Sequence, residues 1–194
     1  MHAARIGPNA ITRLAEAMRA DVGEADTVSL FGRAGLNGYL DSPPEKMVDE
    51  EEVARLHLAL RESLEPERAQ RVSREAGRRT GDYLLAHRIP KPVQWLLHIL
   101  PAPVASGVLL SAIRKHAWTF AGSGTFTATA GEPVRLEISG NPMCRGATSK
   151  VPVCDFYAAT FERLFQKLVH PDARVFEVAC EAMGAPACVF LIRW

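Results

Sequence analysis

Four side chains that suit a metal ion lie in the last quarter of the chain, and they restrict how that quarter can fold. Glu177 and Cys180 are three residues apart, Cys154 comes before them, and Cys188 follows a short turn at Gly184. Thiolate sulfur and carboxylate oxygen are both ligands of tetrahedral zinc, and four protein ligands leave no position for a reactive water. The pattern therefore predicts a closed, structural zinc site that draws these segments together.

Residues 175–194 have the pattern of a β-hairpin, which affects how these ligands can meet. In such a hairpin Cys180 and Cys188 lie near each other across the strands. In a regular strand, however, Glu177 and Cys180 point to opposite faces, because side chains alternate with a period of two. Joint coordination therefore requires a bulge or a strand end near Val178–Ala179.

The cysteines also have interpretations without a metal. A buried cysteine acts as a small hydrophobic side chain, and Cys180 and Cys188 are placed to form a disulfide across the strands. The N-terminus lacks the apolar segment of a signal peptide, which predicts a cytoplasmic protein. In that reducing compartment the four cysteines are expected to be thiols or metal ligands.

The chain changes from helical to strand periodicity at Ala117. After this point strand-forming residues, with Trp118 and Phe120 among the first, predict a hairpin that turns at Gly131–Pro133. Residues 153–169 return to helical spacing before the last hairpin. The order predicts an α+β fold, in which an antiparallel sheet built from two hairpins packs against helices on one face, with a helical N-terminal half. The helices predicted before Ala117 are 11–22, 28–36, 50–60, 66–84, 92–100 and 103–116.

Two of these segments, 92–100 and 103–116, are apolar on every side, which is not the pattern of a surface helix. We expect both to be buried.

Charge and hydropathy exclude several classes of protein. Lys and Arg number 23 against 22 Asp and Glu, so the net charge of +1 gives no overall field to attract nucleic acid or an anionic membrane. No apolar run approaches the roughly 20 residues that a membrane span needs. The only glycine-rich candidate for a cofactor loop, Gly122-Ser123-Gly124, lies among strand-forming residues and lacks the following helix of a dinucleotide-binding site. A bulge or a close ligand approach explains it better.

Three short segments resemble the signature of the 4-vinyl reductase domain family: Cys154, Glu177–Cys180 and Cys188–Phe190. In ligand-sensing members of that family a Cys, a Glu and two further Cys bind zinc, and these positions correspond to Cys154, Glu177, Cys180 and Cys188. The resemblance implies a zinc-braced ligand-binding core at 114–194, with 1–113 as a helical region of the same fold. Cys144 is a possible substitute ligand.

Length, the missing ATPase module and the Asn141–Pro142 loop make the chain similar to the branch of the family that takes part in bacteriochlorophyll biosynthesis. That branch has historically been described as divinyl-chlorophyllide 4-vinyl, now 8-vinyl, reductases. The resemblance implies a tetrapyrrole ligand, enzymes of bacteriochlorophyll synthesis as partners, and a homodimer formed through the helical half. It leaves open a pigment carrier, a reductase that uses an external electron donor, and a small-molecule sensor.

A flat apolar ligand would need aromatic walls and a few polar anchors. We expect a cavity between helices and sheet, in which Trp95, Trp118 and Phe120 contact the ring. His98 and His116 are candidates to bind ring magnesium or a ring carbonyl. Arg114 and Arg145 are candidates to bind ring carboxylates. Each of these residues has a simpler interpretation as core packing or as an exposed charge.

Overall fold

The structure is a computed structural model that describes residues 4–194. Helices fill its N-terminal half, and a short antiparallel pair of strands, β1 (Arg5–Ile6) and β2 (Val48–Asp49), joins two distant segments of that half. Asp49 begins α4 as predicted, because its side chain accepts a hydrogen bond from the Glu51 amide. The helices are α1 (Asn9–Asp21), α2 (Glu24–Ala34), α3 (Gly38–Asp41), α4 (Glu50–Ser63) and α5 (Pro66–His87).

The next two helices, α6 (Lys91–Ile99) and α7 (Ala102–Lys115), correct the prediction that both are buried. Leu97 is the buried residue of α6, while Trp95 is 65% exposed. Their apolar composition is real, but within residues 4–194 no other element covers their outer sides. The described helices include none that is both long and apolar enough to cross a membrane.

The predicted strand at Trp118 and Phe120 is instead a short helix, α8 (Trp118–Ala121). Gly122 ends it with a positive φ of 60°, which a residue with a side chain rarely adopts. The Tyr157 hydroxyl donates to the carbonyl of Phe120 and helps to hold this turn in place.

A four-stranded antiparallel sheet forms the C-terminal half, as predicted, from two hairpins in the order β3-β4-β6-β5. The strands are β3 (Thr125–Thr129), β4 (Val134–Ser139), β5 (Arg174–Ala179) and β6 (Cys188–Arg193). Val134, Leu136 and Ile138 alternate with more exposed neighbours along β4 and point into the core.

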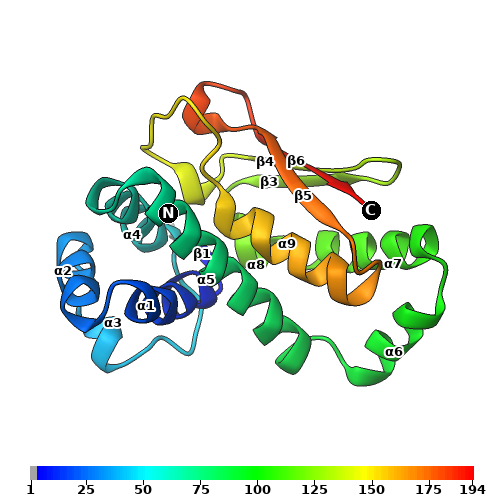
Figure 1. The fold of residues 1–194 in the computed structure, drawn as a ribbon, viewed down its shortest axis with the longest axis horizontal. Helices are drawn as coiled ribbons and strands as arrows, with labels where there is room; N and C mark the ends of the chain where they lie inside the picture. The colour runs from blue at the N-terminus through cyan, green and yellow to red at the C-terminus, as the bar shows by residue number, and fades with distance from the viewer. Residues whose placement is uncertain (1–3) are drawn as a thin grey trace.

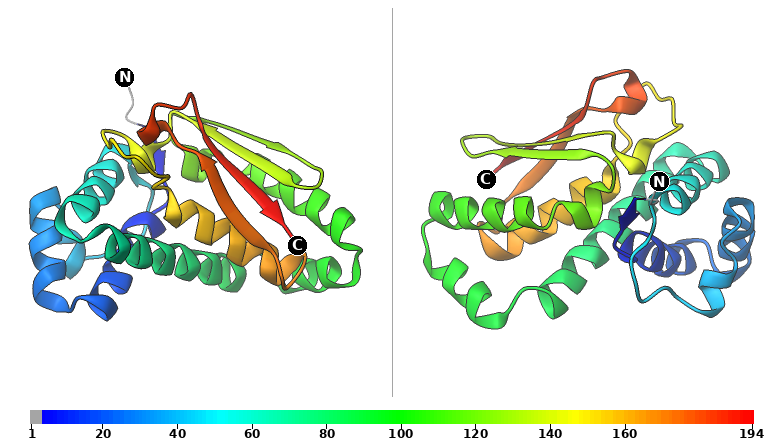
Figure 2. Two further views of the ribbon diagram at one scale, coloured as in Figure 1. Left: turned by 45° about the horizontal axis from the view of Figure 1, so that its top comes forward. Right: turned by 180° about the vertical axis from the view of Figure 1, so that it is seen from behind.

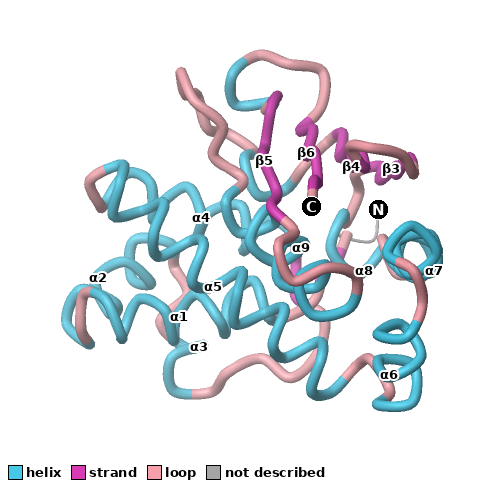
Figure 3. Tube along the Cα trace, turned by 45° about the vertical axis from the view of Figure 1, so that its right-hand side comes forward, coloured by secondary structure: helices cyan, strands magenta, loops and turns pink. Residues whose placement is uncertain are grey.

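Helix α9 (Asp155–Leu168) lies between the sheet and the helical half. Figure 1 shows the sheet on one side of α9 and α5 on the other, and Figure 3 shows the strands gathered at one side of the molecule. One continuous hydrophobic cluster includes residues from both halves. The helices therefore cover one face of the sheet, as the α+β prediction states, while Phe176 and Val178 of β5 are exposed.

Candidate metal centre and its surroundings

Four cysteine sulfurs meet at the end of the sheet where β6 begins. The Sγ atoms of Cys144, Cys154, Cys180 and Cys188 all lie within 4.8 Å of one another, and all four residues are buried. The Sγ atom of Cys188 is 3.5 Å from those of Cys144 and Cys154 and 3.8 Å from that of Cys180. Zinc–sulfur bonds of about 2.3 Å in a tetrahedron place the sulfurs about 3.8 Å apart. The cluster therefore has the dimensions of a tetrahedral metal site.

Four separate segments place these sulfurs. Cys144 ends the 3-10 helix η1 (Pro142–Cys144), and Cys154 precedes the first turn of α9. Cys180 precedes the 3-10 helix η2 (Glu181–Met183), and Cys188 begins β6. All four cysteines are free thiols, so the structure contains no disulfide between Cys180 and Cys188.

Polar groups around the cluster point donors at sulfur. The side-chain amide of Asn141 donates to Cys154 Sγ at 3.3 Å, and the backbone amide of Glu181 donates to Cys188 Sγ at 3.4 Å. The Asn141 oxygen accepts from the Met143 amide, which fixes η1. Donors of this kind stabilise thiolates and orient metal ligands.

A β-bulge lies where the sequence requires one. The pairing of β5 with β6 shifts register between Glu177 and Ala179, so Cys180 turns toward the cluster without a reversal of Glu177. The prediction of a bulge near Val178–Ala179 is confirmed.

Glu177 lies beside the sulfurs but outside the group of four. Its Oε2 atom accepts from the backbone amide of Cys154 at 2.7 Å, and its Oε1 atom is buried without a hydrogen-bond partner among the described residues. Burial, and then the neighbouring Cys180, raises the pKa of Glu177 to about 9. The structure thus brings together Cys154, Cys180 and Cys188 from the predicted ligand set and adds Cys144 to them.

The electrostatics of the cluster favour a cation. Burial raises the pKa of Cys154 well above the ordinary value of a thiol, because the charged form loses its hydration. A positive ion at the centre would reverse this effect by stabilising the thiolates. The sulfur donors and the unpaired carboxylate oxygen therefore fit a metal ion, and four protein ligands would close its coordination sphere.

Arg145, a predicted pigment ligand, belongs to an internal network instead. Its Nη1 atom lies 2.9 Å from the buried carboxylate of Glu50 and also contacts Glu51. The amide and hydroxyl of Ser123 donate to the same Glu50 carboxylate at 2.7 and 2.5 Å. Burial opposes ionisation here, but these hydrogen bonds and Arg145 hold the pKa of Glu50 below its usual value.

The same network explains the Gly122-Ser123-Gly124 segment. A Cβ at Gly122 would overlap the carboxylate of Glu50, and one at Gly124 would lie 2.5 Å from the carbonyl oxygen of Ser139. The glycines therefore admit a carboxylate of the chain itself, as the expectation of a close approach anticipated.

The other predicted pigment ligands lie on α6 and around the end of α7. Trp95 and His98 are exposed on α6, whereas Arg114 and His116 are exposed at the end of α7. Trp118 follows directly and is 62% exposed.

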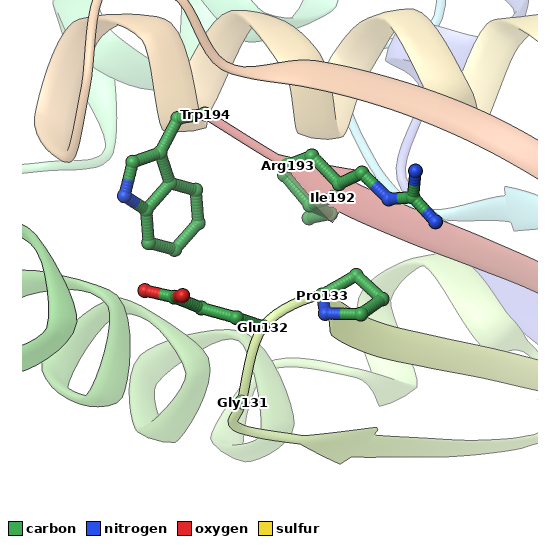
Figure 4. A pocket seen from close by; sticks show the side chains of 6 residues that line it. All are labelled: Gly131, Glu132, Pro133, Ile192, Arg193 and Trp194. Atoms are coloured by element: carbon green, nitrogen blue, oxygen red, sulfur yellow. The ribbon is translucent and has the colours of Figure 1, made fainter.

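Phe120 is half-buried in an aromatic cluster with Phe126, Tyr157 and Phe161, which packs between α9 and the sheet. Within residues 4–194 the predicted ligands therefore do not converge on one enclosed cavity. A separate pocket of about 320 Å³ lies between the β3–β4 turn and the end of β6, lined by Gly131, Glu132, Pro133, Ile192, Arg193 and Trp194 (Figure 4).

Sequence reasoning gave Cys144 only a secondary place. Its signal was its position in the Asn141–Pro142 loop, which the fold brings back to the start of α9. The distance in sequence between Cys144 and Cys188 conceals a sulfur–sulfur contact of 3.5 Å.

Known proteins share both the sequence and the fold of this chain. Residues 134–194 match the 4-vinyl reductase domain family. The bacteriochlorophyll synthase 23 kDa chain of Cereibacter sphaeroides is 47% identical over 96% of this chain and 89% of its own length. The protein of the same name from Rhodobacter capsulatus is 36% identical over 97% of this chain and 87% of its own length.

Solved H-NOX structures share the fold at low sequence identity. An Fe(II) unliganded H-NOX protein mutant from K. algicida is 12% identical, with a TM-score of 0.55 over 97% of this chain and 96% of that chain. An H-NOX protein from S. oneidensis in the Fe(II)NO ligation state is 13% identical, with the same TM-score over 97% of this chain and 98% of that chain. These likenesses establish an H-NOX-like fold, and the curated relatives establish descent: the chain belongs to the family of the bacteriochlorophyll synthase 23 kDa chain.

Proposed function

We propose that this protein binds a tetrapyrrole intermediate of the chlorophyllide or protoporphyrin type and carries or presents it to enzymes of bacteriochlorophyll synthesis, assisting 8-vinyl reduction or a neighbouring step. The observation that carries the proposal is the 47% identity, over nearly the whole chain, to a bacteriochlorophyll synthase 23 kDa chain. A structure with the same fold, 15% identical with a TM-score of 0.52, comes from work on heme redox potential and protein-induced porphyrin distortion. This fold is therefore compatible with a porphyrin in that protein.

The surface at the end of α7 offers the groups that such a ring needs. Trp118 presents a flat, exposed aromatic face, which suits stacking on a macrocycle. His116 offers an imidazole for ring magnesium or a ring carbonyl. Arg114, which donates to the carbonyl of Ala128 at 2.6 Å, offers a guanidinium for a ring carboxylate.

A structural zinc ion is the second part of the proposal. Cys144, Cys154, Cys180 and Cys188 would hold it, because their sulfur spacing fits a zinc–thiolate tetrahedron. Glu177 would orient Cys154 from outside the coordination sphere through the backbone amide. The ion would fix the start of α9 to the last hairpin.

An absorbance titration tests the pigment proposal. Purified protein is titrated with protoporphyrin, its magnesium complex and divinyl protochlorophyllide, and we expect a saturable shift of the main absorption band. His116→Ala should weaken binding of the magnesium pigments more than of protoporphyrin. His87→Ala, an exposed histidine on α5, is the matched control. The proposal fails if none of the three pigments gives a saturable shift.

The same samples distinguish a carrier from a reductase. Conversion of divinyl to monovinyl pigment by the purified protein with NADPH or reduced ferredoxin would establish a reductase in place of a carrier. Binding without conversion is the result we expect.

Metal analysis separates the two possible ligand sets. Wild type should contain one zinc per chain, and Cys144→Ser or Cys180→Ser should lose it together with part of the thermal stability, since metal binding contributes folding free energy. Glu177→Gln should keep the metal with about 10- to 100-fold weaker affinity, the usual effect of removing a group that orients a ligand. Loss of metal in Glu177→Gln but not in Cys144→Ser would replace Cys144 by Glu177 as the fourth ligand.

A further inference from the structure

Helices α6 and α7 present large apolar side chains to solvent at one end of the molecule. Figures 1 and 2 show the two helices at the end opposite α2. Trp95 is 65% exposed, Ile99 58% and Val104 50%. We call this surface the α6–α7 face and define it by its exposed apolar residues, Val93, Trp95, Leu96, Ile99, Val104 and Val108. An exposed group of this size marks an interaction site in a folded protein.

The arrangement of α7 shows that the exposure is ordered. Val104, Val108 and Lys115 recur at helical spacing on the outer side, whereas Leu109 and Leu110 on the inner side are buried. Helix α6 has few contacts with the rest of the protein, and Leu97 is its buried anchor. Both helices therefore offer an apolar side that the described fold leaves uncovered.

Charge around this face has one sign. The sequence contains no Asp or Glu between Asp82 and Glu132, although the whole chain carries 22 acidic residues. The same stretch contains Arg88, Lys91, Arg114 and Lys115, all of them exposed. The net charge of +1 for the chain thus conceals a segment with four formal positive charges.

We propose that the α6–α7 face docks on the surface of an anionic phospholipid membrane, with its apolar side chains at the acyl boundary and its basic residues among the headgroups. Apolar helices with Trp and Leu on one side and Lys or Arg at the rim bind membranes in this way without crossing them. Basic residues add an attraction to anionic headgroups. A second copy of the chain fits less well, because a two-fold contact through this face would bring basic rims against each other.

Vesicle sedimentation tests the proposal with the full chain and no pigment, so its outcome is independent of the pigment proposal. We expect binding to phosphatidylcholine vesicles that contain about one quarter phosphatidylglycerol, and much weaker binding to pure phosphatidylcholine. The double variant Trp95→Ser, Ile99→Ser should lower the partition coefficient at least tenfold. Lys91→Gln with Lys115→Gln should lower it by about fivefold for each residue at low salt.

Matched controls use residues of the same kind outside the face. Phe176→Ser with Val178→Ser removes side chains of β5 that are 54% and 51% exposed, and Lys150→Gln removes an exposed charge beside η2. Both control variants should bind anionic vesicles within about twofold of wild type, since a change of that size is well below the 1.4 kcal/mol of a tenfold effect. All the substituted side chains are exposed, and unchanged melting temperatures would verify that the variants fold.

Quenching of tryptophan fluorescence locates the contact. In Trp118→Phe, Trp194→Phe protein, Trp95 is the remaining tryptophan of the three in the chain. Vesicles with brominated acyl chains should quench it. Absence of quenching, equal binding to neutral and anionic vesicles, or equal loss in the β5 control would overturn the proposal. So would a wild-type dimer that Trp95→Ser, Ile99→Ser converts to a monomer without any change in vesicle binding.

Discussion

Helix α5 crosses α9 at a glycine, and adding one methyl group there should destabilise the fold. A Cβ at Gly77 would overlap the carbonyl oxygen of Phe156 and would lie 3.0 Å from the Cβ of Ala159. The first obstacle is backbone, so no side-chain rotation relieves it. Gly77→Ala therefore requires the two helices to move apart along their contact.

The magnitude follows from two opposing terms. Overpacking a closely packed interior costs about 1–3 kcal/mol, and the overlap with backbone places Gly77→Ala at the upper end of that range. Alanine regains about 1 kcal/mol over glycine in a helix interior. The net loss is about 2 kcal/mol, which for a chain of this size lowers the melting temperature by about 4–8 °C.

Gly107 in α7 provides the matched control. No heavy atom lies within 4 Å of the position that its Cβ would take, and it also lies inside a helix. Gly107→Ala should raise stability by about 0.5–1 kcal/mol, or about 1–4 °C. Thermal unfolding followed by far-ultraviolet circular dichroism at one pH and one metal content measures both variants. A melting temperature for Gly77→Ala at or above that of wild type would refute the reasoning about the helix crossing.

Two further predictions concern buried titratable groups. Burial, and then Arg61, lowers the pKa of His57 from 6.5 to about 3, so the unfolded chain binds a proton more readily than the folded one. Stability is therefore lost as the pH falls below 6.5: urea unfolding should show about 2 kcal/mol more loss between pH 7 and pH 5 in wild type than in His57→Gln, and equal losses would contradict the assignment. Glu50→Gln should cost about 2 kcal/mol, because it removes a charged partner of Arg145 and Ser123 at a buried site. Glu51→Gln, whose side chain is 55% exposed, should cost less than about 0.5 kcal/mol, and similar losses in both variants would show that burial does not matter.

The sheet and most helices could be predicted because local signals agree with tertiary contacts. Asp49 as a cap and the alternation along β4 are visible in the sequence, and the structure uses them as expected. The bulge in β5 could be predicted from the spacing of Glu177 and Cys180 alone, since both had to approach one site.

The errors come from contacts that sequence patterns do not specify. Apolar composition shows that α6 and α7 favour a nonaqueous neighbour, but it does not show that the neighbour is this chain. Trp118 and Phe120 favour strands only when a pleated surface receives them, and here a helical turn held by Tyr157 takes precedence. Cys144 joins the cluster through a long-range approach that no periodic pattern reveals. The division at residue 113 and the dimer stay predictions.

The family match begins at Val134, yet the packing does not stop there. A fragment that started at this residue would lose β3, so the amide and carbonyl groups of β4 would form an unpaired sheet edge. It would also lose α5 and expose the side of α9 that holds Phe156 and Ala159. Such a fragment should aggregate on expression, and the boundary of detectable homology is therefore a poor place to cut this chain.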